Sequence, residues 1–155
     1  MTDASDLAPL VNNLRDARVL CLGDVMLDRF VYGEVTRVSP EAPIPVCRVT
    51  DEASTLGGAG NVARNLTALG AHADTVVVVG DDEPGREVAR LLGRLSNATP
   101  VVVAESGRPT TVKTRYFAAG QQLLRADHES DSAIAATTEE AFVGAAAKMM
   151  DAAGA

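Results

Sequence analysis

The chain of 155 residues is 46% hydrophobic and 23% charged, which suits one packed globular domain. Its formal net charge of −7 argues against a nucleic-acid-binding surface, and its few aromatic residues argue against a base-stacking platform. No apolar run approaches the ~18 residues of a membrane span, and residues 1–10 lack the features of a signal peptide, so we expect a cytoplasmic protein that binds neither nucleic acid nor membrane.

The first predicted elements are a helix and a strand. Leu7, Leu10, Val11 and Leu14 recur with helical spacing, which predicts a short amphipathic helix. Residues 17–24, ARVLCLGD, then form a continuous apolar run that ends in glycine and aspartate. Such a run is typical of a strand that is buried on both faces in a parallel sheet.

Two β-like runs follow, DRFVYGEV and APIPVCRVTD, separated by TRVSPE. Pro40, Pro43 and Pro45 confine these runs to a sheet edge or to a small separate sheet, because proline cannot donate a ladder hydrogen bond. We therefore predict an accessory β flap over residues 29–50.

The pattern from residue 56 to residue 104 alternates between helix and buried strand. Residues 75–80 (TVVVVG) and 100–104 (PVVVA) repeat the buried-strand pattern, and the apolar spacing over residues 88–95 predicts an amphipathic helix between them. Together with the first strand, this order predicts an α/β doubly wound sheet with right-handed crossovers.

The last predicted elements are a β-hairpin and a helix. TTVKTRYF and QQLLRADHE flank the turn AAG, which predicts a hairpin over residues 110–128. Lys113 and Arg115 share one face of its first strand, since strand side chains alternate. The tail begins with a capping box from Thr137 to Glu140 and is predicted to be helical.

Several cysteine, histidine and acidic residues have a simpler interpretation than a role in catalysis or metal binding. Cys21 and Cys47 lie in apolar runs without metal-ligand spacing, so we expect reduced core residues. His72 and His128 have no nucleophile or metal-ligand partner at useful spacing. The acids of GDDEPGRE, residues 80–87, are interpreted as a turn and a helix start. We predict no metal site and assign no catalytic residue.

The stretch TLGGAGNVARNLTALG, residues 55–70, places glycines before an amphipathic helix. Such a turn offers free backbone N–H groups and the positive end of a helix dipole to a hydroxyl or anionic oxygen. The spacing of Gly57, Gly58 and Gly60 matches neither the dinucleotide-binding nor the P-loop pattern, and no predicted buried strand precedes it directly. Asn61 has two interpretations, a helix N-cap and a ligand-binding amide.

Five segments occur in an order that resembles the ribokinase-like (PfkB) carbohydrate kinases: GDVMLDRFVYG, SPEAPIPV, GGAGNVARNLTALGA, VVGDDEPGRE and TTVKTRYFAAGQQLLRADHE. The likeness covers residues 18–129, and VSPEAPIPV, QQLLRAD and the short spacing in GGAGN are most similar to the heptose 7-phosphate kinases of that family. It implies a ribokinase-like, doubly wound α/β sheet with the flap as a lid. Residues 1–155 would form the N-terminal portion of that kinase domain, without its C-terminal half.

The resemblance also implies residues that bind the sugar. Asp28 matches the family's sugar-binding aspartate, whose carboxylate can accept two hydroxyl hydrogen bonds. Gly57 and Gly58 match the di-glycine motif that closes on the sugar ring, and Asn61 matches an asparagine that bonds a hydroxyl. Asp24 is left open between a turn former and a ligand at the carboxyl edge of the sheet.

A sugar phosphate needs cationic partners, and the sequence offers four candidates. Lys113 and Arg115 form the best pair, because they lie on one strand face. Arg37 and Arg125 are the alternatives.

The implied reaction is transfer of the ATP γ-phosphoryl group, with Mg²⁺, to the anomeric hydroxyl of D-glycero-β-D-manno-heptose 7-phosphate, a step of ADP-heptose synthesis for lipopolysaccharide core. Residues 130–155 do not match the family's Gly-Ala-Gly-Asp motif, which carries the catalytic base, so we expect this chain alone to be inactive. The nucleotide-binding residues are not assigned. Another PfkB-type sugar or nucleoside kinase and a non-catalytic binding or assembly module are the alternatives. We also expect a homodimer formed through the flap.

Overall fold

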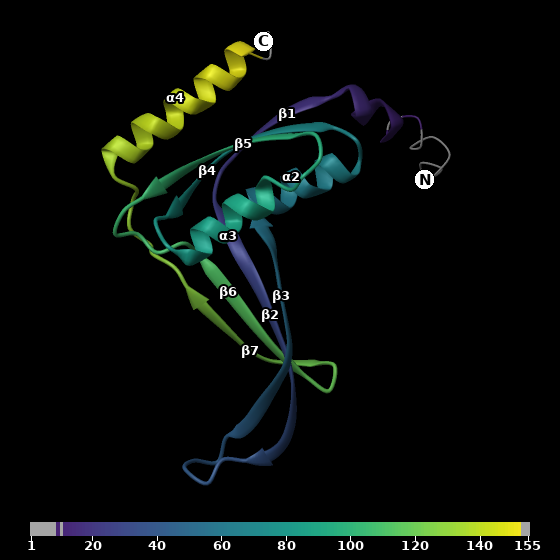
Figure 1. The fold of residues 1–155 in the computed structure, drawn as a ribbon, viewed down its shortest axis with the longest axis vertical. Coiled ribbons are helices and arrows are strands. Elements are labelled where there is room, and N and C mark those ends of the chain that lie inside the picture. The colour runs from purple at the N-terminus through teal and green to yellow at the C-terminus, as the bar shows by residue number, and fades with distance from the viewer. Residues whose placement is uncertain (1–8, 10, 153–155) are drawn as a thin grey trace, which may run out of the picture.

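The computed structural model describes residues 9 and 11–152, which form two β-sheets and the helices around them (Figure 1). The parallel sheet has the order β1-β4-β5, and the second sheet has the order β3-β2-β6-β7. The strands are β1 (Arg18–Leu22), β2 (Val25–Val38), β3 (Pro45–Gly58), β4 (His72–Gly80), β5 (Ala98–Glu105), β6 (Val112–Ala118) and β7 (Gln121–His128). The helices are η1 (Leu14–Asp16), α2 (Ala59–Ala68), α3 (Glu83–Leu92) and α4 (Ala136–Ala152).

The predicted N-terminal helix can be compared with the structure only in part. Leu7 and Leu10 lie outside the described residues, whereas residues 11–13 are helical and lead into the 3₁₀ helix η1. None of the helices in the described part of the chain is long and apolar enough to cross a membrane.

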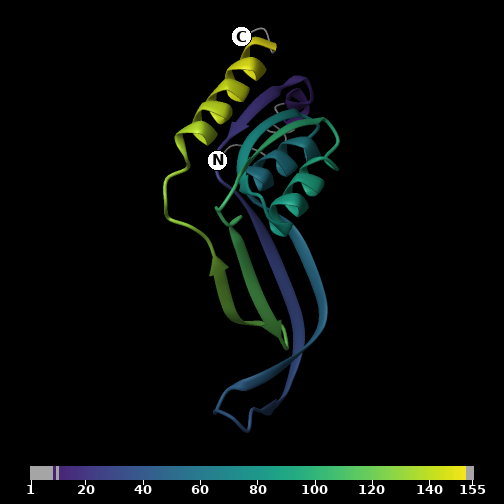
Figure 2. The same cartoon turned by 60° about the vertical axis from the view of Figure 1, so that its left-hand side comes forward.

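The parallel sheet confirms the predicted strands, with β4 at its centre. Helices α2 and α3 cover one face of this sheet and α4 lies on the other (Figure 2). Side chains alternate along β4, so Val77 and Val79 pack against Val88 and Leu92 of α3. Burial on both faces, predicted for residues 17–24, is wrong for β1, because β1 is an edge strand and leaves Leu22 46% exposed.

The second sheet joins the two predicted hairpins into one flap. Strand β2 pairs antiparallel with β3 and parallel with β6, and β6 pairs antiparallel with β7. The first hairpin extends beyond the predicted range of residues 29–50, because β2 and β3 are 14 residues long. Pairing between β2 and β6 ends at Gly33, so residues 34–48 continue as a two-stranded ribbon away from the rest of the molecule (Figure 1).

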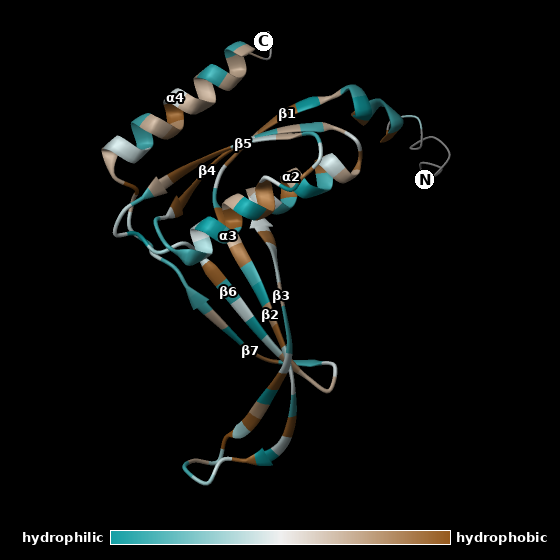
Figure 3. Cartoon of the chain, viewed as in Figure 1, coloured by the Kyte–Doolittle hydropathy of each residue, from teal (hydrophilic) through white to brown (hydrophobic). Residues whose placement is uncertain are grey.

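The base of the flap is part of the hydrophobic core. Val25, Leu27, Leu56 and Val112 are buried together with the apolar side chains of β4 and α3. Figure 3 shows apolar residues concentrated in β4, in β5 and at this junction. Because residues 25 and 27 point into the core, residues 26 and 28 point to the opposite face of the flap. This opposite face carries most of the predicted site residues.

Candidate functional site

Asp28, Lys113 and Arg115 lie on one face of the flap, which we call the polar face. Parallel pairing places residue 28 beside Lys113 and residue 30 beside Arg115. The Asp28 Oδ1 accepts a hydrogen bond from Arg115 Nη1 at 2.6 Å, and these side chains are only 18% and 23% exposed, respectively. The Arg115 guanidinium also lies 5.5 Å from the centre of the Phe30 ring. Arg115 thus both neutralises and orients the Asp28 carboxylate.

Lys113 has two carboxylate partners already. Its Nζ lies 3.0 Å from Asp127 Oδ2 and 2.9 Å from Glu129 Oε2. The hydrogen bonds to Glu129 and Asp127 raise the pKa of Lys113 above its ordinary value. A substrate phosphate at this position would have to displace one of these carboxylates. Arg125, an alternative cation, is paired with the same Asp127 at 3.0 Å.

Arg37 does not join this cluster. It lies in the two-stranded ribbon at residues 34–48, beyond the last pair between β2 and β6 at Gly33. The cationic candidates on the polar face are therefore Lys113, Arg115 and Arg125.

The two glycines at the end of β3 allow close approach to two aspartates. A Cβ on Gly57 would lie 2.5 Å from Met26 Cγ and 2.6 Å from Asp28 Oδ2. Gly58 has a φ of +58°, and a Cβ there would overlap the backbone carbonyl oxygen of Asp24. As expected from the sequence, no buried strand precedes these glycines: β3 is mostly exposed, and only Leu56 and Gly57 at its end are buried.

Asn61 is not a helix N-cap, so that interpretation is wrong. Helix α2 begins at Ala59 with Gly58 as its N-cap residue, and no capping side chain from the described residues bonds there. Asn61 is the third residue of α2, and its Oδ1 accepts a hydrogen bond from Arg64 Nη2 at 2.7 Å. Arg64 Nη1 also bonds Thr55 Oγ1. Thr55 pairs with residue 28 across β2 and β3, so Asn61 lies on the same side of the sheet as Asp28.

A cavity of about 430 Å³ lies at the carboxyl ends of β1 and β4. This edge is where ligands bind in open α/β sheets. Its lining includes Gly23, Asp24, Met26, Val78, Arg108, Thr110, Glu129 and Asp131. Met26 faces Gly57, and Glu129 binds Lys113, so the cavity adjoins the polar face. Sequence reasoning missed Arg108, although its position three residues after the end of the parallel strand β5 was a usable signal.

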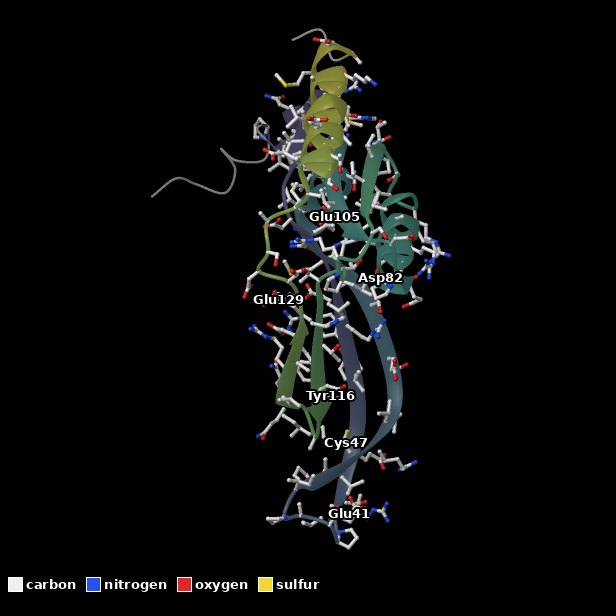
Figure 4. All side chains as sticks on the ribbon, turned by 90° about the vertical axis from the view of Figure 1, so that its left-hand side faces the viewer. Glu41, Cys47, Asp82, Glu105, Tyr116 and Glu129 are labelled. Carbon is white, nitrogen blue, oxygen red and sulfur yellow. The ribbon has the colours of Figure 1, made fainter. Side chains whose placement is uncertain are left out.

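Asp82, one of the acids of GDDEPGRE, holds Thr110 in the wall of this cavity, and the predicted helix start is confirmed. Asp82 caps α3 by accepting a hydrogen bond from the Gly85 N–H at 2.8 Å. Its carboxylate also accepts hydrogen bonds from the backbone N–H (2.8 Å) and the hydroxyl (2.6 Å) of Thr110. Burial opposes ionisation of Asp82, but these hydrogen bonds outweigh it and lower its pKa. Figure 4 shows Asp82, Glu105 and Glu129 at the junction of the two sheets.

The segment after β7 closes the other side of the cavity. Arg108 Nη1 donates to the Ser132 carbonyl oxygen at 2.7 Å, and Glu105 Oε2 accepts from the Ala135 N–H at 3.0 Å. Within residues 9 and 11–152, we find no group of three or more His, Cys, Asp or Glu side chains that could hold a metal ion.

The two histidines and the two cysteines lie outside this arrangement. His72 Nε2 lies 2.9 Å from Thr99 Oγ1, and His128 is at the end of β7. Both cysteines are free thiols, and Cys21 is buried, as predicted. Cys47 is half-buried in the two-stranded ribbon, so its prediction as a core residue is wrong.

Comparison with known proteins gives a consistent family. Residues 16–150 match the family described as pfkB family carbohydrate kinase. The bifunctional protein HldE of Paramagnetospirillum magneticum is 59% identical over 134 residues, which are 86% of this chain and 28% of that protein. The chain thus spans less than a third of the length of this curated relative.

Solved structures share the fold. A carbohydrate kinase from Agrobacterium tumefaciens aligns with a TM-score of 0.59 and 24% identity, over 72% of this chain and 35% of that one. A fructokinase with bound ATP from Xylella fastidiosa aligns with a TM-score of 0.55 and 18% identity, over 76% of this chain and 34% of that one. The predicted α/β fold with a flap is thereby confirmed.

Proposed function

Because the chain belongs to the pfkB family of carbohydrate kinases, we propose that it recognises the sugar in a longer kinase for D-glycero-β-D-manno-heptose 7-phosphate. That kinase would transfer the ATP γ-phosphoryl group to the anomeric hydroxyl, as a step of ADP-heptose synthesis for lipopolysaccharide core. Identity of 59% to a bifunctional protein HldE supports this substrate over those of other sugar or nucleoside kinases, as do the strings VSPEAPIPV and QQLLRAD.

The observation that carries the proposal is the position of Asp28. Its Oδ1 is bound by Arg115, whereas its Oδ2 lies against Gly57, only 2.6 Å from the position that a Cβ would take, so the missing side chain leaves room for this oxygen. A carboxylate oxygen held in this way can accept a hydrogen bond from a sugar hydroxyl that approaches over Gly57. Asn61 on the same side of the sheet, and Gly58 at the turn, complete the proposed contact with the sugar ring.

In the proposed reaction these residues bind and orient the acceptor sugar. Phosphoryl transfer depends on positioning and on charge stabilisation, and both begin with a fixed acceptor hydroxyl. Lys113 and Arg115 are the proposed partners of the 7-phosphate. On binding, the phosphate would replace Asp127 or Glu129 as a partner of Lys113. ATP with Mg²⁺ is the proposed phosphoryl donor. Within the described part of the chain, no three His, Cys, Asp or Glu side chains gather, so we assign no magnesium ligand there.

We also infer that the flap forms a homodimer interface. The two-stranded ribbon and its base expose Val35, Val38, Ile44 and Val49, which are 39–64% exposed. A patch of exposed apolar side chains on an unsupported ribbon is typical of an interaction surface. Replacing Val38 and Ile44 with aspartate should shift the sedimentation coefficient from that of a dimer to that of a monomer. An unchanged coefficient would contradict the interface.

The activity is tested with a longer protein in which this chain is joined to the remaining kinase portion found in its relatives. We expect kcat/KM for ADP release to be higher with heptose 7-phosphate than with any of three other acceptors: the unphosphorylated heptose, fructose 6-phosphate and ribose. A higher kcat/KM with another acceptor would contradict the proposed substrate. Binding without any turnover would favour the non-catalytic module. The 155-residue chain alone should bind the sugar phosphate and release no ADP above background.

A further inference from the structure

We propose that Arg64 is a positioning residue that holds the amide of Asn61 in one orientation, with its Nδ2 group free to donate to the sugar. This inference rests on the proposed function. Held in this way, Asn61 acts as a hydrogen-bond donor toward the sugar.

The guanidinium group of Arg64 makes two hydrogen bonds. One guanidinium nitrogen, Nη2, donates to Asn61 Oδ1 at 2.7 Å, and the other, Nη1, donates to Thr55 Oγ1. Thr55 is fixed in the β2–β3 ladder, opposite Asp28. Arg64 therefore connects the first turn of α2 to strand β3, on the side of the polar face. Because a guanidinium is planar and rigid, two such contacts define its orientation.

The charge of Arg64 is not used in an ion pair. Among the carboxylates of residues 11–152, none lies within ion-pairing distance of Arg64, whereas Lys113 and Arg115 are both paired. Arg64 binds two neutral oxygen acceptors instead. A guanidinium carries five N–H donors and no acceptor, so it can only bind the oxygen end of the Asn61 amide.

This constraint decides which end of Asn61 is available. With Oδ1 bound to Arg64, Nδ2 is the free polar group, and it donates to no other described residue. Asp28 Oδ2, next to Gly57, is an acceptor. The polar face thus offers the sugar one acceptor and one donor. A hydroxyl at Asp28 must donate its proton, and an oxygen at Asn61 must accept one.

A thermodynamic cycle on the 155-residue chain tests this, with heptose 7-phosphate binding measured by calorimetry. Arg64→Met should weaken binding about fivefold to tenfold, the size expected for one hydrogen bond. In an Asn61→Ala background, the same change should weaken binding less than about twofold, because the group through which Arg64 acts is gone. Equal losses in both backgrounds would overturn the proposal. Arg64→Lys, which keeps the charge but not the fork, should recover only part of the affinity.

Asn61→Asp tests the donor role directly. Aspartate keeps the oxygen bound by Arg64 but replaces Nδ2 by a second acceptor oxygen. We expect binding at least as weak as in Asn61→Ala, with a melting temperature that is not lowered. Affinity equal to wild type would overturn the donor assignment. Arg90→Met is the matched control, since Arg90 on α3 binds Glu87 of its own helix, and it should leave the affinity unchanged.

The side-chain amide resonances of Asn61 separate this inference from the proposed function. In ¹⁵N-labelled chain without sugar, Arg64→Met should shift these resonances, and unchanged resonances would overturn the positioning contact. In the wild type, heptose 7-phosphate should shift them further. A folded wild-type chain that binds no heptose 7-phosphate would contradict the proposed function and the donor role together, while the resonances without sugar still report on Arg64.

Discussion

Alanine at Gly57 perturbs the candidate site with a single methyl group. The added Cβ would lie 2.5 Å from Met26 Cγ and 2.6 Å from Asp28 Oδ2, well inside van der Waals contact. Both obstacles belong to side chains, so β2 and β3 can stay paired while Met26 and Asp28 change rotamer. Displacing Asp28 also weakens its 2.6 Å hydrogen bond from Arg115. The substitution should therefore reduce both stability and sugar binding.

The expected magnitude follows from the atoms that must move. Overpacking of this kind costs about 1–3 kcal/mol of unfolding free energy. Alanine at Gly58 should cost more, because it overlaps the Asp24 backbone and because the φ of +58° is unfavourable for a residue with a Cβ. Gly144 in α4 is the matched control: a Cβ there meets nothing within 4 Å, and alanine should stabilise the helix by about 0.5–1 kcal/mol.

Urea unfolding of the 155-residue chain and calorimetry with heptose 7-phosphate measure the two effects. We expect Gly57→Ala to weaken binding at least tenfold, equivalent to about 1.4 kcal/mol, in addition to its effect on stability. Unchanged stability and affinity would refute the close approach of Gly57 to Asp28. A loss of stability with full affinity would refute the role of Asp28 in holding the sugar.

Three further predictions concern charged side chains. Asp28→Asn keeps the shape of the side chain and should weaken heptose 7-phosphate binding by about 1–3 kcal/mol in calorimetry; a change confined to stability would indicate that Asp28 serves only Arg115. Lys113→Ala should weaken binding of the 7-phosphorylated sugar more than that of its unphosphorylated analogue, and equal losses would indicate that Lys113 only joins β6 to Asp127 and Glu129. The lowered pKa of Asp82 stabilises the fold fully above the unfolded-state pKa of about 3.9, and this stabilisation is lost as the pH falls through the lower folded-state pKa. Asp82→Asn should accordingly reduce stability at pH 7 and flatten the fall of stability below about pH 4 in urea titrations, whereas an unchanged pH profile would show that Asp82 does not titrate with folding.

The sequence alone determined the local elements, because hydrophobic periodicity and turn chemistry act over a few residues. Residues 75–80 and 100–104 are strands, the acids at residues 80–87 begin a helix, and residues 110–128 form a hairpin. Alternation along that hairpin sufficed to place Lys113 and Arg115 on one face. The motif order also indicated the family.

Only the tertiary structure decided how these elements combine into a site. The contact between Asp28 and Arg115 joins residues 87 positions apart, and it exists because β2 pairs with β6 in one particular register. Nothing in the local pattern of either strand specifies that partner, since strand pairing depends on which apolar faces are buried together. The same holds for Asn61: its motif resembled a helix start, but the positive φ of Gly58 starts α2 three residues earlier and leaves the amide to Arg64.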